Sequence, residues 1–103
     1  MEREGAVVTI FRSRLRPGVD DEYGPLADRM LVLARATAGF VEFKSFTADD
    51  GERVSIVVFA SPEAQKAWRD HPEHRRARVL GRSRLYESYR VQVCRIEREA
   101  GMG

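Results

Sequence analysis

The order in which strand and helix patterns follow one another constrains this chain more than any other feature. Four runs rich in β-branched and aromatic residues are typical of strands, over residues 6–15, 40–47, 54–60 and 86–98. Amphipathic helical spacing follows the first run and again follows the third. The predicted order is therefore strand, helix, strand, strand, helix, strand, which places the chain in the α+β class.

The first helical stretch carries its apolar residues on one face. They are Tyr23, Leu26, Ala27, Met30, Leu33 and Ala34. The acidic run 20–22 offers N-caps and first-turn carboxylates. Pro25 is compatible with this helix only within its first turn, and Gly39 is a candidate terminator.

The second helical stretch begins with Ser61 as N-cap and Pro62 at the first helical position. Its predicted inner stripe consists of Ala64, Ala67 and Trp68. Pro72 is expected to stop or kink this helix. A further helical segment is predicted over residues 73–80, ended by Gly81.

This order is that of the ferredoxin-like arrangement, a four-stranded antiparallel sheet with both helices on one face. At 103 residues the chain is expected to form a single domain, 1–103, with its core over about residues 6–98. The sheet face without helices carries apolar residues as well. It therefore needs a cover, which could be a ligand, nucleic acid or a second copy of the chain.

Aromatic residues indicate which side chains share a face of the sheet. Phe40, Phe43 and Phe46 are not all of one parity, so either a bulge intervenes or both faces are buried. Tyr86 and Tyr89 are three residues apart, which predicts that they lie on opposite faces of the last strand.

Cysteine content and hydropathy bear on the compartment. The single Cys94 cannot form an internal disulfide, which fits a reducing cytoplasm. No apolar run approaches the ~18 residues needed to span a bilayer, and the charged residues 2–4 precede only a short apolar run, unlike a signal peptide. We therefore expect a cytoplasmic protein without a membrane partner.

His71 and His74 are the only histidines, and their spacing raises the question of metal binding. Pro72 interrupts the helix between them, and no Cys, Asp or Glu at ligand spacing completes a tetrahedral set, so no metal site is predicted. His74 falls on the inward face of its helix. It is either a partly buried, hydrogen-bonded residue or a functional one, such as a proton shuttle, an oxyanion partner or a haem ligand.

Sixteen of the eighteen basic residues are arginines, and residues 75–98 hold eight of them. Nucleic-acid binding has to be considered, because the same element order is found in the RNA-recognition motif. The third strand of that module carries K/R-G-F/Y-G/A-F-V-x-F/Y, whereas residues 52–59 read ERVSIVVF. We therefore expect no nucleic-acid partner and interpret the arginines as a solvated face with exposed ion pairs.

A cavity is predicted between the sheet and its helices, suited to a flat aromatic molecule. Its walls would be formed by Phe11, Met30, Phe40, Phe43 and Trp68. Trp68 is either a core residue or a pocket wall with its indole N–H directed at a ligand.

Several motifs resemble the antibiotic biosynthesis monooxygenase family, over about residues 6–98. They are F-x-x-x-L-x-P-G with Tyr23, Met30, Leu33-Ala34 and Gly39-Phe40, the junction VVFASPEAQKAWRDHPEHRRAR, and the closing GRSRLYESYRVQV. The pattern W-x-x-x-P-E-H-x-x-A…G-R…Y-x-x-Y runs from Trp68 to Tyr89. The resemblance implies a dimeric α+β barrel, in which two ferredoxin-like protomers stack their open sheet faces and the last strand reaches onto the partner.

The resemblance also implies a set of activities. Some relatives oxidise polyketide anthrones to quinones with O2 and no cofactor, others oxidise quinols, and others degrade haem. The cofactor-free members use Asn, Trp and Tyr around an aromatic substrate. This chain contains no Asn, so that role is vacant or filled by another residue.

Three functional hypotheses follow. The first is a small cofactor-independent monooxygenase acting with O2 on an aromatic or polyketide-like phenol or quinol, with His74 as base and Tyr86, Tyr89 or Arg82 steadying the oxyanion. Its substrate would contact Phe11, Met30, Phe40, Phe43, Trp68 and Tyr89. The second is a non-catalytic homodimeric module that binds a small aromatic molecule or assists a pathway. The third is a haem-degrading enzyme, in which Trp68 and His74 take the corresponding roles.

Overall fold

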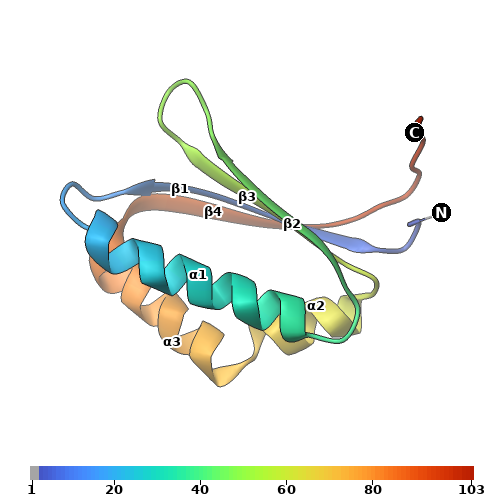
Figure 1. Cartoon of the computed structure of the whole chain (residues 1–103), viewed down its shortest axis with the longest axis horizontal. Coiled ribbons are helices and arrows are strands. Elements are labelled where there is room, and N and C mark those ends of the chain that lie inside the picture. Colours follow the sequence, from blue (N-terminus) through green and yellow to red (C-terminus); the bar gives the residue numbers. More distant parts are fainter. Residues whose placement is uncertain (1–2) are drawn as a thin grey trace.

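The computed structural model describes residues 3–103 and confirms the predicted α+β class and element order (Figure 1). The elements are β1 (Val7–Leu15), α1 (Asp20–Ala36), β2 (Phe40–Thr47), β3 (Arg53–Phe59), α2 (Pro62–Arg69), α3 (Pro72–Leu80), the π-helical turn η1 (Gly81–Leu85) and β4 (Tyr86–Arg95). The first two residues of the predicted domain 1–103 lie outside the described part. No helix within residues 3–103 is long and apolar enough to cross a membrane.

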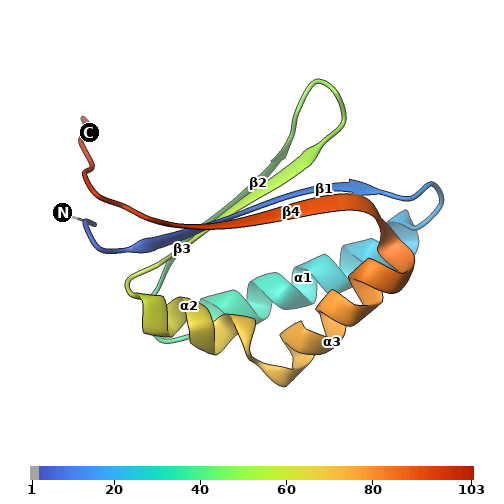
Figure 2. The same cartoon turned by 180° about the vertical axis from the view of Figure 1, so that it is seen from behind.

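The four strands form one antiparallel sheet in the order β2-β3-β1-β4. All helices lie against one face of this sheet, as the two opposite views in Figures 1 and 2 show. α1 packs on β2, while α2 packs on β3 and β1. The helix-side residues of the edge strand β4 are less covered, since Val91 and Val93 are about half exposed.

The ends of α1 differ from the prediction in three respects. Val19 occupies the N-cap position without a side-chain hydrogen bond, so the acidic run 20–22 forms the first turn and acts on the helix dipole instead of capping. Pro25 is the sixth residue of the helix, so the prediction that it lies in the first turn is wrong. The helix ends at Ala36, and Gly39 lies beyond it in the turn to β2, with a φ of 91°.

α2 begins as predicted, because the Ser61 side chain accepts a hydrogen bond from the backbone N–H of Ala64 at 3.1 Å. Its buried residues are Ala64, Gln65 and Trp68. Ala67 is exposed, so its assignment to the inner stripe is wrong. On a helical wheel the three buried residues span one arc of about 100°, and residue 67 falls outside it.

Gly81 does not end the helical region. The backbone continues through η1 and only then enters β4, and the strand register shifts where Leu15 pairs with Tyr86. Both Gly81 and Leu85 are buried in this turn. The prediction of Gly81 as terminator fails because its φ and ψ of −58° and −50° are helical.

A bulge in β2 resolves the parity of its aromatic residues. Phe40 pairs with Phe59 and Phe43 with Val57, which requires one extra residue between Phe40 and Glu42. Phe40 and Phe43 therefore both face the helices. Of the two alternatives left open by the sequence, the bulge is the correct one.

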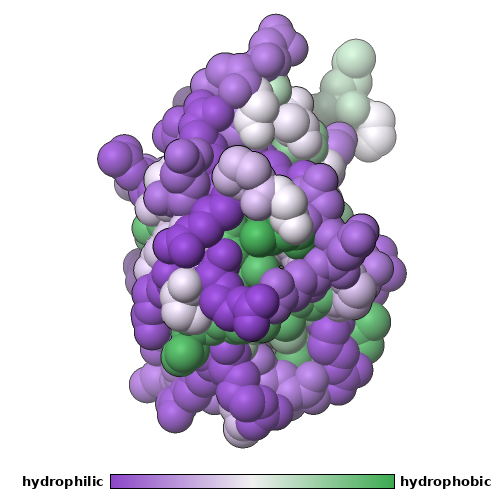
Figure 3. Space-filling model, turned by 90° about the vertical axis from the view of Figure 1, so that its left-hand side faces the viewer, coloured by the Kyte–Doolittle hydropathy of each residue, from purple (hydrophilic) through white to green (hydrophobic). Residues whose placement is uncertain are grey.

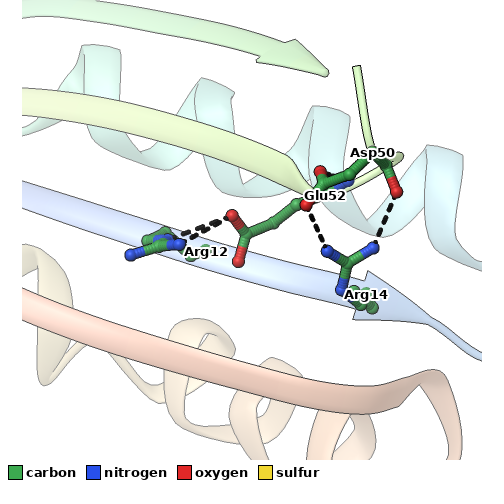
Figure 4. A network of polar contacts seen from close by, with 4 residues as sticks. All are labelled: Arg12, Arg14, Asp50 and Glu52. Atoms are coloured by element: carbon green, nitrogen blue, oxygen red, sulfur yellow. Dashed lines mark hydrogen bonds and ion pairs between the residues drawn. The ribbon is translucent and has the colours of Figure 1, made fainter. Parts of the chain in front are cut away.

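The core lies between β3, α1 and α2. It consists of Leu33, Ala34, Val57, Phe59, Ala64 and Trp68. The helix-free face of the sheet is of mixed character, since partly buried Val8, Ile10, Val54 and Ile56 lie beside charged residues. Two ion pairs cross this face in Figure 4, Arg12 to Glu52 at 2.9 Å and Arg14 to Asp50 at 2.7 Å. Pairing of this face with a second copy stays a prediction.

Candidate active site

A cavity of about 580 Å³ lies between the sheet and the helices, with mostly apolar walls contributed by every strand and by all helical segments. Figure 3 looks at the end of the molecule that holds the β1–α1 loop and the β2–β3 turn, and shows hydrophobic residues surrounded by hydrophilic ones. A space of this size accommodates a small molecule of several rings.

Eight of the nine site residues proposed from the sequence line this cavity. They are Phe11, Met30, Phe43, Trp68, His74, Arg82, Tyr86 and Tyr89. Phe40 is not part of the lining; its ring packs against that of Phe59, at a centroid distance of 6.1 Å. The shared cavity brings the eight together, while their individual roles stay predictions.

One end of the cavity, which we call the core end, is formed by Trp68 and His74, and the fully buried Phe59 packs behind Trp68 outside the lining. The Trp68 ring lies 5.5 Å from that of Phe59 and 4.3 Å from that of His74. Its indole Nε1–H donates to the backbone carbonyl of Met30 at 3.3 Å, so the Trp68 ring is fixed to α1. Trp68 is thus both a core residue and a cavity wall, and its N–H is engaged by the protein.

His74 is a neutral imidazole in this site. Burial lowers its pKa to about 4, and the positive charge of Arg78 acts in the same direction. A hydrogen bond with the Arg69 backbone opposes the shift and is outweighed. Nδ1 is among the buried side-chain atoms without a hydrogen-bond partner. A neutral ring retains an unprotonated nitrogen that can receive a proton, but the low pKa makes His74 a weak base at pH 7.

The opposite end, which we call the tyrosine end, is formed by Phe11, Tyr23, Tyr86 and Tyr89. Tyr86 is the centre of this cluster, with its ring 5.3 Å from Phe11, 6.0 Å from Tyr23 and 5.8 Å from Tyr89. The prediction that Tyr86 and Tyr89 lie on opposite faces is wrong. Tyr86 directly follows η1 at the register shift, so simple strand alternation does not apply between the two residues.

Tyr86 is a neutral phenol. Burial raises its pKa above the usual range, and the neighbouring Tyr23 adds to the effect. The opposing influence of Arg53 is smaller. The hydroxyl of Tyr86 therefore keeps its proton and can serve as a hydrogen-bond donor inside the cavity.

Sequence reasoning missed a buried polar pair in the cavity wall. Gln65 Nε2 donates to Thr9 Oγ1 at 3.3 Å, and both residues are 5% exposed. The buried position of Gln65 could have been predicted from the sequence, because Gln65 follows Ala64 and precedes Trp68 by three positions on α2. This carboxamide is a polar group available in a chain without asparagine.

Arg53 and Tyr23 were also missed as site residues. The guanidinium Cζ of Arg53 lies 5.1 Å from the centre of the Tyr23 ring, and both residues line the cavity. Tyr23 was recognised only as part of the apolar stripe of α1. Within residues 3–103, no three His, Cys, Asp or Glu side chains lie close enough together to hold a metal ion.

The helix-covered face of a ferredoxin-like sheet, enclosing an apolar cavity with a few polar groups, defines a small α+β domain suited to binding an organic molecule. A family model described as antibiotic biosynthesis monooxygenase matches residues 6–79. The chain belongs to this family.

The chain is also similar to individual proteins. The chain is 39% identical over 90 residues to "Uncharacterized protein YqjZ" of Bacillus subtilis (strain 168), which covers 87% of this chain and 79% of that protein. It resembles the structure of Rv0793 from Mycobacterium tuberculosis, with a TM-score of 0.81, 26% identity, and 93% and 99% of the two chains covered. SnoaB from Streptomyces nogalater, a cofactor-independent oxygenase, shares the fold with a TM-score of 0.73, 17% identity, and 96% of each chain covered.

Proposed function

We propose that this protein is a small cofactor-independent monooxygenase that acts with O2 on a phenol or quinol of aromatic or polyketide type. The observation that carries the proposal is a neutral, largely buried His74 against Trp68 in an apolar cavity. Family membership and the fold shared with SnoaB support this reaction class.

The proposed reaction converts a phenol with a free para C–H position, together with O2, into a para-quinone and water. His74 accepts the phenolic proton, and the resulting phenolate donates one electron to O2. Recombination of the two radicals forms a carbon–oxygen bond at the para carbon and gives a peroxide. Cleavage of the O–O bond with loss of the para proton leaves one oxygen atom in the quinone and releases the other as water.

The low pKa of His74 sets the cost of the first step. A free phenol has a pKa of about 10, so complete proton transfer to a base with a pKa of about 4 costs about 8 kcal/mol without further help. A turnover near 1 s⁻¹ corresponds to a barrier of about 17 kcal/mol, which leaves about 9 kcal/mol for the reaction with O2. In this proposal the Tyr86 hydroxyl and the Arg82 guanidinium, which both line the cavity, lower the first cost by stabilising the phenolate.

The proposed working unit is a homodimer joined through the helix-free face of the sheet. That face exposes Phe46 at 48% and carries partly buried valines and isoleucines over its centre. Sedimentation across a wide concentration range tests this. A monomer at every concentration would contradict the dimer.

The oxygenase proposal is tested by substituting each of the two histidines. His74→Ala should lower O2 uptake by at least about 100-fold with a panel of phenols, hydroquinones and anthrones, because the proton acceptor is lost. His71→Ala is the matched control, since His71 caps α3 by accepting from the Glu73 N–H and does not line the cavity. Equal turnover by His74→Ala and wild type would rule out the assigned base. A Soret shift on adding haemin would favour the haem-degrading alternative.

A further inference from the structure

The cavity wall contains more positively charged residues than negatively charged ones. The lining includes Arg53, Arg69, Arg78, Arg82 and Asp28. Arg69 is bonded to Asp70 at 3.2 Å. Within the part of the chain that the structure describes, Arg53, Arg78 and Arg82 form no ion pair. The described lining therefore carries net positive charge, since its one carboxylate, Asp28, forms no ion pair with these three arginines.

Arg53 is the member of this set that lies at the tyrosine end. It is the first residue of β3 and pairs with Ser13, on the face of the sheet that carries the helices. The Cζ atom of its guanidinium lies over the Tyr23 ring at 5.1 Å, and its charge acts on the Tyr86 hydroxyl. Stacking on an aromatic ring leaves the N–H groups in the guanidinium plane available to a ligand.

The carboxylates closest to Arg53 in the chain bond other arginines. Asp50 and Glu52 belong to the same β2–β3 turn, but they bond Arg14 and Arg12, as Figure 4 shows. Alternation along β1 and β3 directs Arg12 and Arg14 to the helix-free face and Arg53 to the other. The strand pattern thus separates Arg53 from these acids.

The carboxylate next to Tyr23 in the chain also bonds another arginine. Glu22, next to Tyr23 in α1, bonds Arg84 at 3.2 Å. An uncompensated guanidinium beside an apolar cavity favours an anionic ligand group, because charge-assisted hydrogen bonds strengthen where water is partly excluded. A carboxylate matches the planar fork of arginine, with two parallel hydrogen bonds.

The length of the cavity limits the shape of such a ligand. The lining residues of β3 run from Arg53 to Val57, four residues apart, which corresponds to roughly 13 Å. Val57 belongs to the same core cluster as Trp68, at the core end. A molecule that touches both ends needs several fused rings, which the volume of about 580 Å³ allows.

We propose that the cavity takes an extended aromatic acid, whose carboxylate is bound by Arg53 at the tyrosine end while its rings lie toward Trp68 at the core end. This inference deepens the proposed function and rests on it for the identity of the reacting phenol. The binding of the carboxylate itself is a separate property and is measurable without any reaction.

The test compares rhein, a dihydroxyanthraquinone carboxylic acid, with its methyl ester, which has nearly the same shape and no carboxylate charge. Dissociation constants are measured calorimetrically without O2, at low salt and neutral pH. Wild-type protein should bind the acid about 10- to 100-fold more tightly than the ester, the range expected for a hydrogen-bonded ion pair. In Arg53→Gln that preference should fall below about 3-fold, with the affinity for the ester unchanged.

Two further variants test whether the preference for the acid depends on Arg53 itself. Arg98→Gln removes an exposed arginine that does not line the cavity, and it should keep the full preference for the acid. Arg53→Lys should retain part of it, because the charge remains without the fork geometry. Equal binding of acid and ester by wild type, an unchanged preference in Arg53→Gln, or no binding of either ligand by the folded protein would each overturn the inference. Acid-selective binding, together with no O2 uptake on the panel of phenols, hydroquinones and anthrones, would instead refute only the oxygenase proposal.

Discussion

The two ends of the cavity are built in different ways. At the core end, Phe59 is fully buried and Trp68 is 7% exposed, both held between the sheet and two helices. At the tyrosine end, Tyr89 is 44% exposed, and the position of Tyr86 depends on the irregular backbone of η1. Tertiary packing thus fixes the first end and local backbone geometry fixes the second.

The two ends also differ in how their polar groups are covered. His74 is a largely buried, neutral imidazole at the core end, with the charge of Arg78 acting on it, whereas Arg53 is charged and exposed at the tyrosine end. Burial favours the uncharged form of a titratable group, while an exposed guanidinium keeps its charge available to an ionic group. One small cavity thus has a covered, uncharged imidazole at one end and an exposed cation at the other.

The substitution with the largest expected effect disrupts the packing of the tyrosine end. A Cβ added at Gly81 would overlap Cε2 of Tyr86 and lie 2.9 Å from its Cδ2. Gly81→Ala should therefore lower the free energy of unfolding by about 3 kcal/mol or more, because the Tyr86 ring must leave its place against Phe11 and Tyr23. Chemical denaturation followed by circular dichroism measures the loss.

Gly24→Ala is the matched control for this substitution. Gly24 lies inside α1, and no other heavy atom lies within 4 Å of an added Cβ. The change should raise the free energy of unfolding by about 0.5–1 kcal/mol, because alanine has the higher helix propensity. Similar stabilities of the two variants would show that Tyr86 is free to move and that η1 does not fix it.

The core end was the more predictable of the two from the sequence. Ser61 and Pro62 define the start of α2, and helical periodicity then directs Trp68 inward. The inward position of His74 follows in the same way from Pro72 and the spacing of α3. Local propensity and tertiary packing agree there, so the pattern is readable without a structure.

The structure of the tyrosine end could not be predicted from the sequence in this way. Gly81 has the identity of a helix terminator, yet its dihedral angles are helical, and glycine is needed there because the Tyr86 ring occupies the space of a side chain. The register shift opposite Leu15 results from pairing between β1 and β4, which are about 70 residues apart in the chain. Arg53 was overlooked because its role depends on which carboxylates its neighbours bond.

The next prediction concerns the core end and the pH dependence of the free energy of unfolding. Because the native pKa of His74 is lowered to about 4, the unfolded chain binds more protons than the native state between about pH 6.5 and pH 4. Stability from this group is fully present above that window and is lost as the pH falls through it. The free energy of unfolding should drop by about 2 kcal/mol between pH 7 and pH 5 on this account.

Urea denaturation at the two pH values tests this, with His74→Gln and His71→Gln compared to wild type. His74→Gln should lose about 2 kcal/mol less than wild type on acidification, whereas His71→Gln should behave like wild type. The same acid loss in all three proteins would show that His74 is not the responsible group.

A smaller effect concerns the buried polar pair at the wall. Gln65→Leu leaves the Thr9 hydroxyl buried without its partner, which should cost about 1–2 kcal/mol. Adding Thr9→Val removes the stranded hydroxyl, so the double variant should recover most of the loss. The coupling from a double-mutant cycle should be about 1 kcal/mol. Additive losses would mean that the two side chains do not depend on each other.

The smallest effect tests whether the tyrosine end serves recognition more than stability. The contact of Arg53 with the Tyr23 ring is partly exposed, and such contacts contribute about 0.5–1 kcal/mol. Arg53→Gln should therefore lower the free energy of unfolding by less than about 1 kcal/mol, close to the near-zero change expected for Arg98→Gln. A loss of several kcal/mol would identify Arg53 as a structural residue, since a group kept free for a ligand contributes little to the fold of the empty protein.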